Sequence, residues 1–193
     1  MRRSGILIGV LALVAACRTE PPKAQSEYVD SAIPIEEALH RFRTRLPRPA
    51  SLEGGYPSRE KLVREFVRAL EGRDTVALRR MVLNPGEFAW LYYPSSPLSR
   101  PPYELSPGLM WFQLQGESEK GASRLLAERA GQPLGYLRHE CGSPRTQGEL
   151  HIYPNCALHR VIPPADTLAE RLFGLVVERE GEYKFLGYAN MLE

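Results

Sequence analysis

The last apolar stretch of the chain constrains the fold most, because it predicts a β-hairpin whose two faces are both largely apolar. Residues 171–178 and 182–188 are strand-like runs on either side of Glu180-Gly181, a dipeptide suited to a tight turn. A two-residue turn there gives three pairs on one face: Val177 with Lys184, Leu175 with Leu186, and Phe173 with Tyr188. The other face pairs Glu178 with Tyr183, Val176 with Phe185, and Gly174 with Gly187. One face should therefore pack on helices, while the other lines a cavity, a partner or a second layer.

Two helices are predicted ahead of the strands. An apolar stripe with helical spacing runs along residues 58–71 and comprises Leu62, Val63, Phe66, Val67 and Leu70. Gly72 stands where a glycine is expected just after a helix, and Asp74 can cap a second helix that carries Leu78 and Met81. Asn84-Pro-Gly86 should end that second helix.

The middle of the chain predicts a long loop and a third helix. Residues 94–107 are rich in proline, and Ser106-Pro107 is a suitable helix start. We expect Leu109 and Phe112 to be buried, and a break or kink near Gly116. Short strands over 134–139 and 157–162 precede the hairpin, so helices come first and antiparallel strands last, which is the α+β class.

The beginning of the chain has the features of an export signal. Two arginines precede the apolar run 5–16, which is shorter than the roughly twenty residues that span a bilayer. The following residues, Val14-Ala15-Ala16-Cys17, resemble the lipobox of bacterial lipoproteins. This resemblance implies removal of residues 1–16 and acylation of Cys17, which would anchor the protein to a membrane of the cell envelope. Because residue 18 is Arg and not Asp, we expect the periplasmic face of the outer membrane if the host has two membranes; an ordinary signal followed by a chance cysteine is the alternative.

These features divide the chain into three predicted parts. Residues 1–16 are the expected signal peptide, and residues 17–57 are a lipidated tether with a short docking helix. Leu39, Phe42 and Leu46 share one face of that helix, although a mobile basic arm is the alternative. Residues 58–193 form a single α+β domain.

The charge of the mature chain argues against a nucleic-acid partner. Removing residues 1–16 takes two of the 25 Lys and Arg residues, so 23 remain against 23 Asp and Glu. Binding to phosphates normally requires a basic stripe, and none is present.

The two later cysteines predict a disulfide. Once Cys17 carries lipid, Cys141 and Cys156 pair without remainder in an oxidising compartment. A zinc site built from these two with His139 and His151 would have unusual spacing, and a C-x-x-C redox motif is absent. A tight hairpin turning at residues 145–146 would hold the cysteines about 20 Å apart. The disulfide therefore predicts that residues 142–155 leave the sheet as a loop.

A further resemblance concerns the segment between the first two helices of the domain. Leu70-Glu-Gly72-Arg-Asp74 is similar to the helix, Gly-Asp, helix opening of the nuclear-transport-factor-2-like superfamily, with an arginine inserted between Gly and Asp. The resemblance covers roughly residues 58–193. It implies a curved antiparallel sheet wrapped around the helices as a cone, with a pocket at the open end. Ketosteroid isomerases, polyketide cyclases, dehydratases and proteins without known catalysis share this fold.

The sequence identifies no catalytic residue. The family's enzymes use a pocket Asp with a Tyr, an acid or a His, and no such motif is matched here; Asp74 is expected to be a cap, and His151, His159 and Tyr153 to be structural. Common hydrolase, metalloprotease and nucleotide-binding motifs are also absent. The candidates for a pocket wall are six aromatic residues: Phe88, Trp90, Tyr92, Trp111, Phe173 and Tyr188.

We therefore expect a non-catalytic envelope lipoprotein, with neither metal nor cofactor, that binds a small apolar ligand or another envelope protein. An isomerase or hydratase of the same fold is the alternative.

Overall fold

The computed structural model describes residues 33–188. The expected signal peptide 1–16, the lipidation site Cys17, the tether up to residue 32 and residues 189–193 lie outside the described residues. No helix between residues 33 and 188 is long and apolar enough to cross a membrane.

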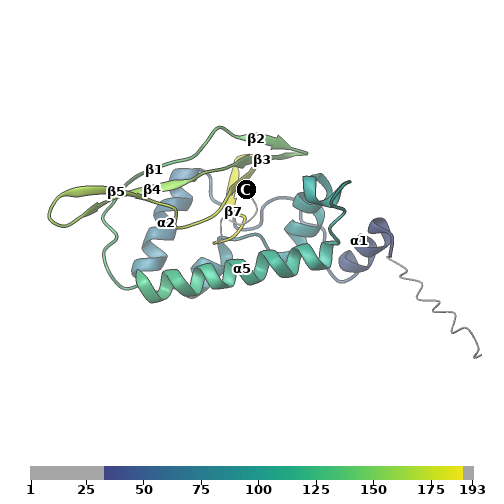
Figure 1. Cartoon of the computed structure of the whole chain (residues 1–193), viewed down its shortest axis with the longest axis horizontal. Helices are drawn as coiled ribbons and strands as arrows, with labels where there is room; N and C mark the ends of the chain where they lie inside the picture. Colours follow the sequence, from purple (N-terminus) through teal and green to yellow (C-terminus); the bar gives the residue numbers. More distant parts are fainter. Residues whose placement is uncertain (1–32, 189–193) are drawn as a thin grey trace, which may run out of the picture. The chain divides into compact units, whose positions relative to one another are not determined.

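The described chain is an α+β fold in which helices precede an antiparallel meander, as the sequence predicts (Figure 1). The helical elements are α1 (Ile35–Arg43), α2 (Arg59–Glu71), α3 (Thr75–Arg80), α4 (Pro85–Glu87), the π-helix η1 (Phe88–Tyr92), the 3-10 turns η2 (Tyr93–Ser95) and η3 (Pro97–Ser99), and α5 (Pro107–Glu128). The strands are β1 (Tyr136–Glu140), β2 (Arg145–Gln147), β3 (Leu150–Tyr153), β4 (Ala157–Ile162), β5 (Asp166–Glu170), β6 (Val176–Arg179) and β7 (Glu182–Phe185).

The first two helices of the domain begin where the capping residues predict. The Ser58 side chain accepts a hydrogen bond from the Lys61 N–H at the start of α2, and Asp74 accepts one from the Ala77 N–H at 2.9 Å at the start of α3. The residue with left-handed backbone between them is Arg73 (φ 57°), whereas Gly72 stays right-handed. The arginine inserted between Gly and Asp therefore makes the turn that the sequence analysis assigned to the glycine.

Helix α5 is continuous, so the predicted break near Gly116 is wrong. A Cβ at Gly116 would meet nothing within 4 Å, and a single glycine inside a helix costs only about 1 kcal/mol. The predicted burial of Leu109 and Phe112 is also wrong: they are 46% and 74% exposed, while Met110 and Leu114 point inward. Gly121 has the clearest packing role, because a Cβ there would lie 2.2 Å from the Tyr188 carbonyl oxygen.

The C-terminal hairpin has the predicted register. Val177 lies opposite Lys184, and Val176 opposite Phe185. Further hydrogen bonds, from the Leu186 N–H to the Leu175 carbonyl and from the Gly174 N–H to the Gly187 carbonyl, continue the pairing beyond the assigned strands.

Helices cover both faces of this hairpin, so the second face meets a second layer. Val176 and Phe185 pack into a core cluster with α2 and α3, whereas Val177, Leu175 and Leu186 pack with η1 and α5. Phe173 and Tyr188 belong to the first cluster and not, as predicted, to the face of Val177. In the view of Figure 1, α5 runs along the lower side of the strands.

The predicted loop over residues 142–155 is instead part of a hairpin that carries the disulfide. The pairing of Thr146 with His151 and of Gln147 with Leu150 follows the same register as the pairing of Glu140 with Ala157. The turn lies at Gly148-Glu149, three residues after the position considered from the sequence, and this shift brings Cys141 opposite Cys156. The two cysteines form the expected disulfide.

The strands belong to two sheets, ordered β1-β4-β5 and β2-β3-β6-β7. Three chain segments contribute a strand to each sheet: 136–147, 150–162 and 166–179. Each of these segments is interrupted at the junction between the sheets, where the cysteines and residues 171–175 lie.

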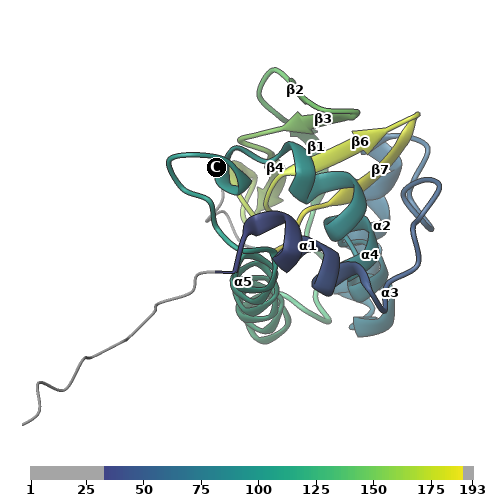
Figure 2. The same ribbon diagram turned by 90° about the vertical axis from the view of Figure 1, so that its right-hand side faces the viewer.

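Helix α1 packs on the rest of the described chain. The Arg43 guanidinium donates two hydrogen bonds to the Ala89 carbonyl, at 3.1 and 2.8 Å, and lies 4.0 Å from the centre of the Trp90 ring. Phe42 meets Phe88 edge to face. Figure 2 shows α1 beside the N-terminal end of α5.

Loss of the disulfide is expected to lower the free energy of unfolding by about 3 kcal/mol, since the bond closes a segment with a sequence separation of 15. Urea denaturation of the oxidised protein and of the Cys141→Ser/Cys156→Ser double variant measures the difference. Equal unfolding midpoints and slopes for the two proteins would contradict the expectation.

Candidate functional site

The structure does not gather the six predicted aromatic residues into one pocket wall. Phe173 and Tyr188 are buried in the core cluster beneath α2. Phe88 and Tyr92 are buried in the second cluster, with Trp90 and Trp111 partly buried at its edge. Of the six, Trp111 and Tyr188 line one cavity and Tyr92 lines another.

The larger cavity is a groove between α3 and α5 with a volume of about 760 Å³. One wall is α3 with the segment that follows it, and the other wall is α5 from Trp111 to Leu126; Leu186 and Tyr188, after β7, complete the lining. The α5 wall has small side chains at its middle, including Ser118 and Ala122. A groove can form here because these small residues leave space that larger side chains would fill.

Apolar groups dominate the lining. The residues that contribute carbon surface are Leu78, Val82, Leu83, Pro85, Trp111, Leu114, Ala122, Leu126, Leu186 and Tyr188. The polar groups are Thr75, Arg79, Asn84, Gln115, Ser118, Glu119 and Ser123. A mainly apolar lining with a few polar groups is typical of sites for small molecules.

Tyr188, which lines the groove, is held in a fixed orientation. Its hydroxyl donates a 2.7 Å hydrogen bond to the Leu78 carbonyl, and its backbone N–H donates one of 3.1 Å to the Ser118 hydroxyl. Burial raises the pKa of Tyr188 far above its ordinary value, so the phenol stays protonated at every physiological pH.

The groove offers one carboxylate, that of Glu119, among its lining residues. Glu119 is exposed and accepts a 2.9 Å hydrogen bond from Gln115, its neighbour on α5. The Tyr188 hydroxyl is already bonded to the Leu78 carbonyl, so the pair is not arranged for proton transfer to a common ligand atom.

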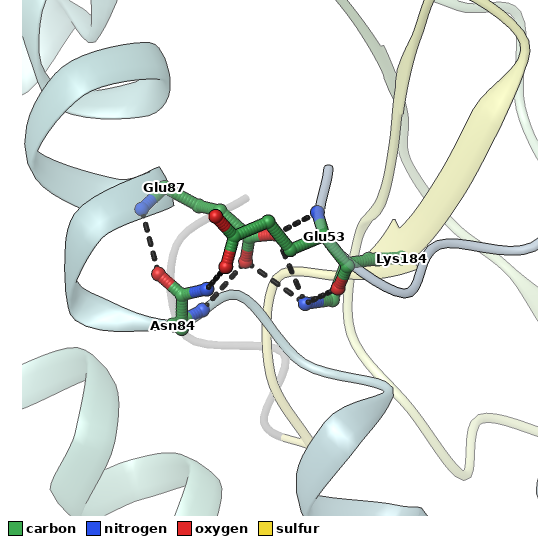
Figure 3. Close-up of polar contacts among 4 residues, drawn as sticks. All are labelled: Glu53, Asn84, Glu87 and Lys184. Atoms are coloured by element: carbon green, nitrogen blue, oxygen red, sulfur yellow. Dashed lines mark hydrogen bonds and ion pairs between the residues drawn. The ribbon is translucent and has the colours of Figure 1, made fainter. Parts of the chain in front are cut away.

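Figure 3 shows a buried ionic network formed by Glu53, Asn84, Glu87 and Lys184. Asn84 also belongs to the lining of the groove. The Lys184 ammonium lies 2.9 and 3.1 Å from the two Glu87 carboxylate oxygens, and both side chains are almost completely buried. The Glu87 carboxylate also accepts hydrogen bonds from the backbone N–H groups of Glu53 and Asn84, at 2.6 and 2.7 Å. The Asn84 side chain in turn accepts one from the Glu87 N–H, which makes a capping box at the start of α4. Every strong hydrogen-bonding group of the pair has a partner, so the network is structural.

Three of the four histidines have local side-chain partners. The His139 Nδ1 atom lies 3.1 Å from the Tyr136 hydroxyl and 3.2 Å from a Glu60 oxygen. Burial lowers the pKa of His139, while burial and Glu60 raise the pKa of Tyr136 to about 12. His151 and His159 lie on strands near Glu178 and Glu140, at 3.8 and 3.3 Å. In the part of the chain that the structure describes, no three His, Cys, Asp or Glu residues are grouped to hold a metal ion.

The sequence predicts the pairing of Lys184 with Val177, but not its ion pair with Glu87 or the role of the small residues of α5. Lys184 occupies an inward position of the alternating hairpin, which already implies a buried charge in need of an acid. Asn84-Pro-Gly-Glu87 has the spacing of a capping box, which places an acid at the start of a helix. No short sequence pattern predicts the groove, because the groove depends on the distance between two helices.

Comparisons of the chain with protein-family models, with curated proteins and with solved structures return no significant match.

Proposed function

We propose that the protein is a lipid-anchored protein of the bacterial envelope that binds a small apolar ligand in the groove between α3 and α5, without chemical turnover. The observation that carries this proposal is the groove itself. Its volume of about 760 Å³ falls within the range of roughly 300–1,000 Å³ typical of ligand sites. Its aromatic and aliphatic lining favours a neutral, ring-bearing or aliphatic molecule.

The anchor part of the proposal rests on the sequence at Cys17 and on the later disulfide. Acylation of Cys17 would attach the chain to a membrane, and residues 18–32 would separate the anchor from α1. The Cys141–Cys156 bond supports maturation in an oxidising compartment, where such bonds persist. We place the protein on the periplasmic face of the outer membrane if its host has two membranes.

The finer architecture in this proposal is the cone of the nuclear-transport-factor-2-like superfamily. Two features support it: three long segments that each contribute to both sheets, and two successive helices joined by Gly72-Arg-Asp74. In that arrangement the interrupted strands would give the sheet its curvature. The groove would then be an opening along the helical side.

A binding role is favoured over an isomerase or hydratase of the same fold. Such an enzyme needs an acid or base facing a tyrosine or histidine across the ligand. Among the residues lining the groove, Glu119 is bonded to its helical neighbour and Tyr188 to a backbone carbonyl.

The test uses a neutral fluorescent probe, N-phenyl-1-naphthylamine, whose emission rises on transfer to an apolar site. The Ala122→Phe substitution places a ring in the groove and should weaken probe binding to the purified full chain about tenfold or more, because the probe loses its space. Fluorescence titration measures the change.

The matched control is Ala127→Phe, which adds the same ring at an exposed position of α5 outside the groove lining. Ser123→Phe, at the exposed rim, provides a second groove variant that tolerates the added volume. Equal probe affinity in the folded wild type, Ala122→Phe and Ser123→Phe proteins would overturn the proposed site.

A further inference from the structure

A second cavity, of about 530 Å³, lies between the η2–η3 segment and strand β2. Its lining comprises Tyr92, Ser95, Ser96, Pro97, Leu98, Arg100, Tyr103, Arg145, Thr146, Gln147 and Gly148. It shares no lining residue with the groove between α3 and α5. Any ligand it holds is therefore separate from the apolar ligand proposed above.

The cavity is built by a local change of helix type. The π-helix η1 ends at Tyr92 and passes into the 3-10 turn η2, and π-helical turns occur often at functional sites. The Ser95 hydroxyl lies 3.3 Å from the Tyr92 carbonyl and 3.2 Å from the Gln147 carbonyl, which ties the turn to β2. Gly148 permits this approach: its φ is 62°, and a Cβ there would lie 2.9 Å from the Ser95 Cβ.

Three polar side chains are buried at the cavity. Tyr92, Ser96 and Gln147 are 3%, 1% and 7% exposed. Burial raises the pKa of Tyr92, with Arg145, Ser96 and Gln147 opposing that effect, so the hydroxyl remains a hydrogen-bond donor near Ser96 and Gln147. The Ser96 oxygen accepts a 3.3 Å hydrogen bond from the Leu98 N–H, and the Ser96 side chain is also hydrogen-bonded to Tyr92.

Two exposed arginines, Arg100 and Arg145, line the same cavity. Arg100 comes from the end of η3 and donates a 3.4 Å hydrogen bond to the Pro94 carbonyl. Arg145 comes from β2, and within residues 33–188 neither arginine forms an ion pair. The nearby Glu149 is bonded to Arg179, and the adjacent Glu104 is not among the lining residues. The cavity therefore has positive charge without a carboxylate in its lining, although the mature chain is nearly neutral.

We infer that this cavity binds a small molecule through an oxyanion group, a phosphate or a carboxylate, held between Arg100 and Arg145. Arginine suits this role because its planar guanidinium recognises such groups through two parallel hydrogen bonds. The Tyr92 hydroxyl, to which Ser96 and Gln147 are hydrogen-bonded, supplies a further donor to the bound group. Tyr103, which is 66% exposed at the edge, can lie over a ring attached to it.

The probes are phenyl phosphate and benzoate, titrated into the purified full chain at fixed ionic strength and followed by NMR and calorimetry. Binding should shift the amide signals of residues 92–103 and 145–148. Arg145→Gln and Arg100→Gln should each weaken binding roughly ten- to hundredfold, since each removes a charge-assisted contact. Arg124→Gln, which removes an exposed charge from α5 outside both cavities, is the matched control and should leave affinity unchanged.

The soluble lipid dihexanoylphosphatidylglycerol distinguishes a lipid headgroup from a free small anion as the source of the oxyanion. Tighter binding of phenyl phosphate supports a free small molecule, and tighter binding of the lipid with the same arginine dependence supports a headgroup. Absence of shifts at residues 92–103 and 145–148, or equal weakening by Arg124→Gln, would overturn the inference. The Arg100 and Arg145 variants should still bind N-phenyl-1-naphthylamine. Retained probe binding shows that a failure of the anion site is distinct from a failure of the apolar groove.

Discussion

Replacing Lys184 with methionine is expected to lower the free energy of unfolding by about 3–5 kcal/mol, the cost of leaving one partner of a buried ion pair uncompensated. The Glu87 carboxylate would keep its two backbone donors, but its charge would stay in a fully buried site without a cation. The Glu53 carbonyl would also lose the hydrogen bond from Lys184 that ties the segment before α2 to the hairpin. Urea denaturation followed by circular dichroism measures the loss.

Two comparisons make this prediction specific. Lys120→Met removes a lysine from an exposed pair with Glu117, and such a pair contributes at most about 1 kcal/mol. The double variant Glu87→Gln/Lys184→Met removes both charges and should recover a large part of the stability lost in Lys184→Met alone. A Lys184→Met protein as stable as Lys120→Met would contradict the structural role of the buried pair.

The Phe66→Ala substitution is expected to cost about 3–5 kcal/mol of stability, because it opens a cavity at the centre of the core beneath α2. The Phe66 ring is fully buried, and the centres of the Phe173, Phe185 and Tyr188 rings lie 5.3, 5.6 and 5.9 Å from its own. Thermal and urea unfolding of the variant give the magnitude.

The matched control for this prediction is Phe112→Ala, at an aromatic residue on α5 that is 74% exposed. It should change stability by no more than about 0.5 kcal/mol, as surface substitutions generally do. The sequence predicts a buried Phe112, so the two variants also test the orientation of α5. A larger loss for Phe112→Ala than for Phe66→Ala would contradict the structure.

The elements that sequence analysis predicted well are those whose signals are local. The alternation on both sides of Glu180-Gly181 specified the register of β6 and β7, because a two-residue turn leaves few alternatives. The spacing of Leu62, Phe66 and Leu70 likewise indicated the buried face of α2. The capping role of Asp74 follows from chemistry within three residues.

The errors concern features that depend on contacts distant in sequence. The disulfide was expected to require a loop because the turn was placed at residues 145–146; the actual turn at Gly148-Glu149 depends on Leu150 and Ile152 facing the core. Gly116 was expected to break α5, but the packing of Met110 and Leu114 on one side of the helix outweighs its weak propensity.

The candidate sites were predictable only in part. Trp111 and Tyr188 were named as pocket residues, and they do line the groove, but the other four aromatic residues pack elsewhere or line the second cavity. Aromatic composition alone cannot separate core from pocket, because both environments bury large rings. The residues that open the groove, Ser118 and Ala122, are small and carry no chemical signal in a sequence.

The most direct test of the account is a site-resolved NMR experiment on the full chain with bound N-phenyl-1-naphthylamine. The account predicts nuclear Overhauser contacts between the probe and the side chains of Trp111, Leu114 and Leu126, which line the groove. Saturable binding with contacts confined to the exposed Leu109 and Phe112, or to any other surface, would contradict the claim that this groove is the ligand site.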